Sequence, residues 1–352
     1  MNQRSDELFM RRAFDLARLG STGVAPNPMV GAVLVHHGRI IGEGYHRRHG
    51  GPHAEVEAVR AVSPTDRPLL RQATLYVSLE PCCVFGKTPP CTDLILQEGI
   101  PKVVISSVDR SPGVDGKGVE ILQKAGVEVI TGLLAKEGDE LSATRNTFVT
   151  QERPYVTLKF AHSTDGFLGK PDRPVWLTNA FSQRLVHRWR SEHSAILVGT
   201  RTATIDNPQL STRFFPGPSP LRIAVDLNGQ IPEGAHLLDD RGPTWIIARK
   251  SPPRASHYKH TRWLLAQDRD DWWPLLLREL VDAGKSSLLV EGGAALLQYL
   301  IERGQWDEAR VFVSSTHLGG GVPAPILPGL PDRMLRIGSD RLYLFHRAVH
   351  TR

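Results

Sequence analysis

The sequence predicts an α/β protein built from two successive layered domains. Its 352 residues correspond to about two domains at roughly 150 residues each. Short apolar runs alternate with helical patterns along the whole chain, which is typical of layered α/β structure. The composition, 40% hydrophobic and 23% charged, is that of a globular protein and excludes disordered and fibrous classes. We place the boundary near Arg153, which gives domains of residues 1–150 and 151–352.

The first half starts with an amphipathic helix, because Phe9, Ala13, Leu16 and Ala17 recur on one helical face. Apolar runs then predict strands at Val30–Val35, Thr74–Leu79, Lys102–Val108 and Val127–Ile130. Helical patterns lie between these strands, at Ala54–Val62, Thr92–Glu98 and Gly118–Lys124. A polar, helix-like stretch over Leu133–Arg153 then meets Pro154, where we end the domain.

The second half repeats this alternation with different segments. Strands are predicted at Tyr155–Ala161, Ala195–Gly199, Leu221–Asp226, Thr244–Ala248, Ser287–Val290 and Arg310–Ser314. The Pro/Gly-rich stretch Phe214–Pro220 predicts a surface loop, and Arg249–Arg262 reads as basic and irregular. The two halves share no repeat, which favours two different activities over a duplication.

All three cysteines lie close together in the first half, in a pattern typical of zinc deaminases. His53-Ala54-Glu55 is followed by Pro81-Cys82 and then by Cys91. One imidazole and two thiolates suit Zn²⁺ and leave a fourth position for water. The metal lowers the pKa of that water to about 7, and Glu55 would shuttle the proton to the leaving amine.

Two further choices follow from this motif. Residues two apart do not share a face of a helix, so His53 and Glu55 fit one site only at a helix start, which Pro52 supports. Cys83 is an alternative ligand, but we prefer Cys82 because it follows the predicted strand end. The alternative to catalysis is a closed structural zinc site, for which His49 would be the spare ligand.

The segment from Leu79 to Cys91, LEPCCVFGKTPPC, resembles the deaminase half of the bifunctional deaminase/reductases of riboflavin biosynthesis. Pro26–Gly31 and Gly42–His46 resemble the same half. The resemblance implies a cytidine-deaminase-like α/β/α domain, zinc bound by His53, Cys82 and Cys91, and Glu55 as acid and base. It also implies a phosphorylated pyrimidine substrate, 2,5-diamino-6-(5-phosphoribosylamino)pyrimidin-4(3H)-one, contacted by Asn27, His46, Lys87 and Asp109.

Two positions depart from this family's pattern. Val84 stands where a His is usual, and Ser111 stands where Asp-Pro-Asn-Pro carries its Asn. Both departures leave the zinc chemistry intact and concern substrate binding.

In the second half, no G-x-G-x-x-G follows a strand, so a Rossmann dinucleotide site is not expected. Arg153–Gly166, Trp176–Thr178, Ala195–Thr200, Asp206–Pro208 and Val290–Gly293 resemble the reductase half of the same family, and the resemblance fades beyond Gly321. It implies a dihydrofolate-reductase-like domain and NADPH. The residues that would line the cofactor are Lys159, Ala161, Ser163, Trp176, Thr178, Thr202, Asp206 and Gly293. The residues that would hold the substrate are Arg190, Leu210, Arg213 and Glu291.

The net charge of +6 fits an anionic small molecule as well as a nucleic acid. A nucleic-acid base deaminase with an accessory domain is therefore the alternative, but basic residues are scattered and no aromatic stacking platform is evident, so we expect no nucleic-acid partner. No apolar run is long enough for a membrane span and no leader is visible, so we expect a cytoplasmic protein, and the family resemblance implies a homo-oligomer. Arg249, Lys250 and Arg254 either read the NADPH 2′-phosphate or form a solvated loop.

Overall fold

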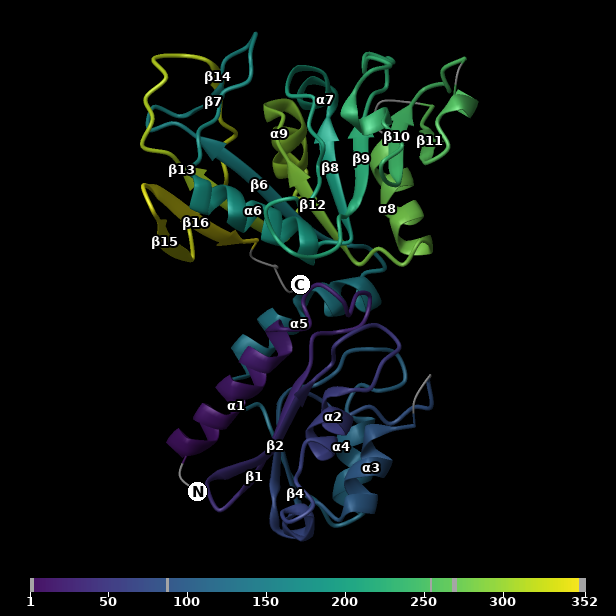
Figure 1. Cartoon of the computed structure of the whole chain (residues 1–352), viewed down its shortest axis with the longest axis vertical. Helices are drawn as coiled ribbons and strands as arrows, with labels where there is room; N and C mark the ends of the chain where they lie inside the picture. The colour runs from purple at the N-terminus through teal and green to yellow at the C-terminus, as the bar shows by residue number, and fades with distance from the viewer. Residues whose placement is uncertain (1–2, 87–88, 254, 268–270, 348–352) are drawn as a thin grey trace. The chain divides into compact units, whose positions relative to one another are not determined.

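The structure is a computed structural model that describes residues 3–86, 89–253, 255–267 and 271–347. The chain divides into two compact units, Met1–Arg153 and Pro154–Arg352, each with its own sheet (Figure 1). None of the helices in these ranges is long and apolar enough to cross a membrane.

In the first unit, the described residues form a five-stranded sheet in the order β2-β1-β3-β4-β5. The strands are β1 (Gly31–His36), β2 (Arg39–Tyr45), β3 (Thr74–Leu79), β4 (Lys102–Ser107) and β5 (Glu128–Thr131). Strands β3, β4 and β5 are parallel, and β1 pairs antiparallel with both β2 and β3. Residues after β3 and β4 therefore meet at one edge of the sheet.

Helices cover both faces of this sheet. One core cluster joins Leu34, Val77 and Ile105 to the helices α2 (Ala54–Arg60), α3 (Cys91–Glu98) and α4 (Lys117–Lys124). The alternate residues Val33, Tyr76 and Val104 point the other way, toward α1 (Gln3–Arg18) and α5 (Ala135–Thr150). This alternation produces a three-layer α/β/α unit.

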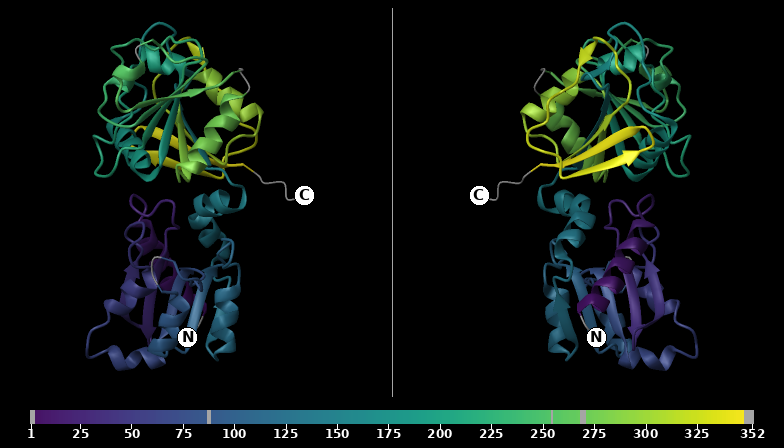
Figure 2. Two further views of the ribbon diagram at one scale, coloured as in Figure 1. Left: turned by 90° about the vertical axis from the view of Figure 1, so that its right-hand side faces the viewer. Right: turned by 90° about the vertical axis from the view of Figure 1, so that its left-hand side faces the viewer.

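In the second unit, the described residues form a nine-stranded sheet in the order β11-β10-β9-β8-β12-β6-β13-β16-β15. Its strands are β6 (Tyr155–His162), β8 (Ala195–Gly199), β9 (Leu221–Val225), β10 (Thr244–Ala248), β11 (Thr261–Leu265), β12 (Ser287–Glu291), β13 (Glu308–Val313), β15 (Arg333–Ile337) and β16 (Asp340–His346). All run parallel from β11 to β13, and β16 and β15 complete one edge antiparallel (Figure 2). A separate small pair joins β7 (Phe167–Gly169) and β14 (Val322–Pro323).

Two helices pack on each face of the large sheet. Leu197 and Val290 face α8 (Trp272–Asp282) and α9 (Ala294–Glu302), while their neighbours Ile196 and Leu289 face α6 (Ala180–Glu192) and α7 (Thr200–Ile205). A parallel sheet covered on both faces is built from continuous apolar strands, which explains why these strands were predicted.

The predicted strands are present, with ends shifted by a residue or two. Strands β2, β7, β11, β14, β15 and β16 were not predicted. The expectation of an irregular stretch over Arg249–Arg262 was wrong at its end, because β11 starts at Thr261 and pairs with β10. Edge strands such as β11 and β15 are half-exposed and therefore lack the continuous apolar run of central strands.

Candidate active sites

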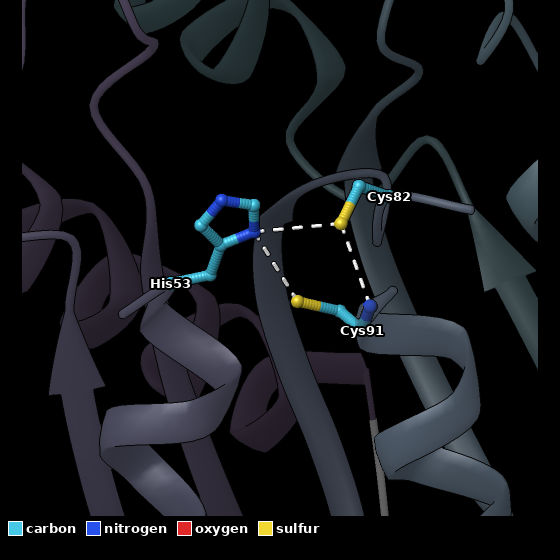
Figure 3. Close-up of side chains that lie close together, drawn as sticks. All are labelled: His53, Cys82 and Cys91. Carbon is cyan, nitrogen blue, oxygen red and sulfur yellow. Dashed lines mark hydrogen bonds between the residues drawn. The ribbon is translucent and has the colours of Figure 1, made fainter. Parts of the chain in front are cut away.

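The His53, Cys82 and Cys91 side chains converge at the edge of the first sheet where β3 ends (Figure 3). Cys82 follows β3, His53 is the N-cap of α2, and Cys91 is the first residue of α3. His53 Nδ1 lies 3.4 Å from Cys82 Sγ and 3.3 Å from Cys91 Sγ, and the Cys91 amide donates to Cys82 Sγ over 3.4 Å. The ligand atoms of all three residues lie within 4.8 Å of one another.

Glycines let α2 come close enough to carry His53 into this cluster. A Cβ on Gly42 would lie 2.4 Å from the carbonyl oxygen of Ala58, and one on Gly44 would lie 2.4 Å from the Ala58 amide nitrogen. Only glycine allows helix and strand backbones to approach this closely. His53 itself has extended backbone angles, φ −74° and ψ 166°, so it sits just outside the helical register as the H-x-E spacing predicted.

The donor set fits zinc. Among the described residues, the group within ligand distance holds His53, Cys82 and Cys91 alone, so neither His49 nor Cys83 belongs to it. Cys83 instead donates toward the Gly113 carbonyl. A hydrogen bond from Cys91 lowers the pKa of the Cys82 thiol, and His53 lowers it further. A thiolate with one imidazole and a second sulfur is the arrangement that zinc binds with an open fourth position.

Glu55 lies directly beside these three residues without being one of them. Its side chain is buried and forms a hydrogen bond with Cys91. Burial raises the pKa of Glu55 to about 7, and the nearby Cys82 adds to this effect. A carboxyl group with a pKa close to neutrality can both take up and release a proton, as a general acid and base must.

Asn27 and His46 lie next to the cluster. Asn27 Nδ2 is 3.1 Å from His46 Nε2, and the His46 ring lies 5.4 Å from the His53 ring, centroid to centroid. His46 Nδ1 donates to the carbonyl of Pro52, which fixes its tautomer so that Nε2 accepts from Asn27. Burial lowers the pKa of His46, so the ring is neutral at pH 7. Lys87 lies outside the described residues.

Asp109 follows β4, and its loop is held by a residue that the sequence reasoning missed. The buried carboxylate of Glu80 accepts hydrogen bonds from four backbone amides, those of Asp109, Gly116, Gly118 and Val119. Asp109 in turn accepts from the Ser111 amide at 2.8 Å. The signal in the sequence was the position of Glu80 directly after an apolar strand. A carboxylate that is buried at such a position needs several hydrogen-bond donors.

In the second unit, Lys159, Arg190 and Glu291 form a buried charged cluster. Glu291, the last residue of β12, is the register partner of Lys159 in the second half of β6. Arg190 on α6 binds both oxygens of Glu291, from Nε and Nη2, at 2.7 Å each. Burial alone would raise the pKa of Glu291, but the charge and hydrogen bonds of Arg190 lower it to about 2. Burial lowers the pKa of Lys159.

Gly292 and Gly293 connect β12 to α9 in left-handed conformations, with φ of +78° and +79°. Thr202 lies against them, since a Cβ on either glycine would fall within 3.4 Å of Thr202 Oγ1. No side chain caps the start of α9. Free amides at a helix start beside bare backbone are suited to an anionic group such as a pyrophosphate.

The other residues predicted for the cofactor lie at the same sheet edge. Ser314, directly after β13, donates from Oγ to the carbonyl of Leu177, and this places the Trp176–Thr178 segment there. Trp176 is 77% exposed, which excludes a core role for it. Of three further predicted residues, Ala161 lies near the end of β6 and Ser163 follows that strand, whereas Asp206 follows α7. The Ser163 hydroxyl accepts from the Phe167 amide, so it is committed to a local turn.

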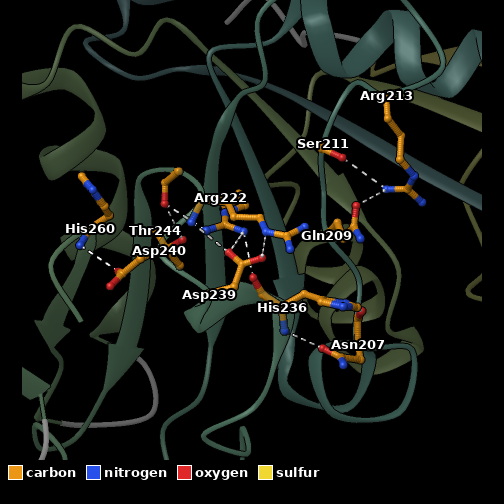
Figure 4. Close-up of polar contacts among 12 residues, drawn as sticks. Asn207, Gln209, Ser211, Arg213, Arg222, His236, Asp239, Asp240, Thr244 and His260 are labelled. Carbon is orange, nitrogen blue, oxygen red and sulfur yellow. Dashed lines mark hydrogen bonds and ion pairs between the residues drawn. The ribbon is translucent and has the colours of Figure 1, made fainter. Parts of the chain in front are cut away.

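The loop after α7 carries Leu210 and Arg213, and Figure 4 shows Arg213 with its neighbours Gln209 and Ser211. Asn207 anchors it, because its Oδ1 accepts from the His236 amide and its carbonyl accepts from His236 Nδ1. Arg213 reaches back to Gln209 Oε1 and Ser211 Oγ, both at 3.2 Å. The side chain of Leu210 is buried in the core with φ +54°, so only its backbone is available to a substrate.

Comparison with known proteins gives a family match for each of the two units. Residues 3–107 match the family model of the cytidine and deoxycytidylate deaminase zinc-binding region, and residues 154–342 match that of the RibD C-terminal domain. The second match continues past Gly321, where the resemblance was expected to fade, as far as residue 342.

Full-length relatives cover both units. The riboflavin biosynthesis protein RibD of Aquifex aeolicus is 38% identical over 92% of this chain and 90% of its own length. That of Bacillus amyloliquefaciens is 36% identical over 92% and 88%. The crystal structure of a Thermotoga maritima diaminohydroxyphosphoribosylaminopyrimidine deaminase/5-amino-6-(5-phosphoribosylamino)uracil reductase superposes with a TM-score of 0.88 at 35% identity, covering 98% of this chain and 99% of that one.

These matches confirm the predicted fold class, a cytidine-deaminase-like domain followed by a reductase domain, and the prediction of zinc and NADPH as cofactors. The chain belongs to the RibD family of riboflavin biosynthesis enzymes, which join a zinc deaminase to a reductase in one polypeptide.

Proposed function

We propose that this chain performs two successive steps on one phosphorylated intermediate. The domain predicted over residues 1–150 hydrolyses 2,5-diamino-6-(5-phosphoribosylamino)pyrimidin-4(3H)-one to 5-amino-6-(5-phosphoribosylamino)uracil and ammonia. The domain predicted over 151–352 then reduces the ribosyl side chain to ribityl with NADPH. The observation that carries the proposal is the convergence of His53, Cys82 and Cys91 with the buried, non-ligand carboxyl of Glu55. A structural zinc site needs no such carboxyl.

In the deaminase site, His53, Cys82 and Cys91 would hold the metal. Zinc supplies a Lewis acid that makes water nucleophilic at neutral pH. Glu55 takes one proton from the attacking water and delivers it to the ring nitrogen. It then moves the second proton of that water, from the new hydroxyl group, to the departing amine, so that water and substrate give the carbonyl product and ammonia. Asn27 and His46, fixed by their mutual hydrogen bond, orient the substrate beside Glu55. Asp109 and Lys87 are the remaining substrate contacts that we propose.

In the reductase site, reduction requires one hydride and one proton, and NADPH supplies the hydride. The charged cluster at the ends of β6 and β12 holds the substrate close to the cofactor edge. Because both oxygens of Glu291 are engaged by Arg190, these two residues act together, and Arg213 is the cation available for the 5′-phosphate. Lys159 and Asp206 are the candidates for polar assistance at the reacting carbon.

A pocket of about 800 Å³ at the ends of β9 and β10 extends the proposed cofactor site. Strands β12, β8, β9 and β10 are adjacent and parallel, so this pocket opens at the same sheet edge as the Gly292–Gly293 turn. Its lining combines Tyr258 and Trp263 with the cations Arg249 and Lys250. We therefore place the adenine of NADPH against the aromatic side chains and its 2′-phosphate near the two cations. Arg254, the third candidate, lies outside the described residues.

We also propose a homo-oligomer in the cytoplasm with no nucleic-acid partner. The site chemistry supports the absence of a nucleic-acid partner, because phosphorylated small molecules account for the basic residues. Sedimentation of the purified protein, with and without tRNA, tests the oligomeric state and the absence of nucleic-acid binding.

The test of the two reactions is a product mass spectrum. Purified protein with zinc receives the diaminopyrimidinone substrate, with and without NADPH. We expect the deamination mass shift alone without NADPH, and a further gain of two hydrogens with it. Reduction without deamination would contradict the first half of the proposal, and no shift in either sample would contradict both halves.

A further inference from the structure

Arg145 on α5 connects the two loops that carry proposed deaminase substrate residues. Its Nε and Nη2 donate to Ser111 Oγ at 3.3 Å and 3.1 Å. Its Nη1 donates to the carbonyl of Pro26, the residue before Asn27, at 3.4 Å. Ser111 accepts these bonds two residues after Asp109. The guanidinium therefore lies between the Asn27 loop and the Asp109 loop.

Arg145 differs from other buried arginines because it lacks an acidic partner. Arg190, Arg222 and Arg310 each form an ion pair within 4.0 Å with a glutamate or aspartate. Among the ion pairs formed by residues that the structure describes, none includes Arg145. Its side chain is half-buried, and this burial lowers its pKa despite the charge of Asp109 nearby. A desolvated cation of this kind is unfavourable unless an anion joins it.

The position of Arg145 indicates which anion this is. Arg145 binds the carbonyl of Pro26, and the next residue, Asn27, contacts His46, whose ring lies 5.4 Å from the ring of His53. A chain of contacts therefore connects Arg145 to the zinc cluster. Three of its five N–H groups donate to uncharged oxygens that fix the plane of the guanidinium. The remaining N–H groups can bind an oxyanion, and the fork of arginine matches phosphate geometry.

We propose that Arg145 binds the 5′-phosphate of the deaminase substrate, and this inference rests on the proposed function. In this proposal, Arg145 binds the phosphate end of the substrate while the pyrimidine ring of the same molecule lies beside Glu55. The departure at position 111 fits this role, because the Ser111 hydroxyl accepts two hydrogen bonds from Arg145 without neutralising its charge.

The test compares Arg145→Met with Arg145→Lys and with the control Lys136→Met, which removes an exposed cation from the same helix. Ammonia release is measured on the phosphorylated substrate and on its dephosphorylated nucleoside. Loss of a charge-assisted contact to phosphate should raise KM for the phosphorylated substrate by about 10- to 100-fold in Arg145→Met. KM for the nucleoside should change less than about twofold, Arg145→Lys should restore part of the loss, and Lys136→Met should behave as wild type.

Bound zinc and NADPH-dependent reductase activity show in the same samples that each variant is folded. If Arg145→Met is unfolded, Arg145→Lys tests the role of Arg145 by itself. Its KM should then rise more for the phosphorylated substrate than for the nucleoside. Equal losses on both substrates, or no loss, would overturn the role of Arg145 while leaving the proposed function intact. If wild-type protein releases no ammonia from the phosphorylated substrate, the proposed function fails first and the inference fails with it.

Discussion

The buried pair of Arg190 and Glu291 allows a quantitative prediction about the second unit. The two side chains are only 12% and 10% exposed and share two hydrogen bonds of 2.7 Å. Glu291→Gln keeps the shape of the side chain but removes its charge, and so leaves Arg190 buried beside the cationic Lys159. Breaking a buried ion pair by removing one partner costs about 3–5 kcal/mol. The fall in the pKa of Glu291 from its ordinary 4.5 to about 2 corresponds to about 3 kcal/mol, which agrees with the cost of breaking the ion pair.

Tryptophan fluorescence measures this loss selectively. All seven tryptophans lie after residue 153, so a urea unfolding curve followed by fluorescence reports the second unit. We expect its free energy of unfolding to fall by about 3–5 kcal/mol at pH 7 in Glu291→Gln. The matched control is Glu192→Gln, which breaks the ion pair with Arg188 on α6, the helix that also carries Arg190. This change should lower the free energy of unfolding by less than about 0.5 kcal/mol.

The pH dependence supplies an independent check. Because folding lowers the pKa of Glu291, its contribution is complete above about pH 4.5 and disappears as the pH falls through about 2. The difference between wild type and Glu291→Gln should therefore be largest above pH 4.5 and should shrink between these values. Replacing both partners, as in Arg190→Met with Glu291→Leu, should recover much of the loss. A loss below about 1 kcal/mol at pH 7 would refute the reasoning, as would a difference that is constant with pH.

Three further predictions concern the first unit. Cys82→Ser should abolish bound zinc and ammonia release, whereas Cys83→Ser should retain both. Metal analysis and an ammonia assay measure the two properties, and loss of zinc in Cys83→Ser would contradict the proposed ligand set. Glu80→Gln leaves two of four buried amides without a carboxylate oxygen and should destabilise the unit by about 2–4 kcal/mol, with faster hydrogen exchange at those amides; unchanged exchange would rule out this anchoring role. Gly44→Ala forces α2 away from β2 and should cost about 1–3 kcal/mol and lower the deamination rate, whereas Gly86→Ala, which meets no neighbour, should leave the melting temperature unchanged.

Elements were predictable from the sequence where one local signal decides the outcome. β3 was predicted with its observed ends, because a short run of apolar and β-branched residues is typical of a strand that is buried on both faces. β2 was missed because Gly42 and Gly44 interrupt its alternation, and these glycines are present for the approach of α2. β15 was missed because two arginines, Arg333 and Arg336, interrupt its apolar residues at an exposed edge.

Site residues were likewise predictable where a short local motif contains them, and not where their contacts are distant in the sequence. His53 and Glu55 share a short motif whose spacing already requires a helix start, and Cys82 follows a predicted strand. Arg145 gave no such signal, since its partners lie 34 and 119 residues away in the sequence. A contact between a helix and two distant loops depends on packing and leaves no periodic pattern behind.

A common chemistry links the two sites across the two units. Arg145 and Arg213 are each held by uncharged oxygens, those of Ser111 and Pro26 in one case and of Gln209 and Ser211 in the other. Neither belongs to an ion pair among the residues described, and burial lowers the pKa of both guanidinium groups. The proposed reactions leave the 5′-phosphate unchanged from the first substrate to the last product. If both arginines bind this phosphate, as we propose, orientation by neutral acceptors serves each site, because a carboxylate partner would compete with the phosphate for the guanidinium.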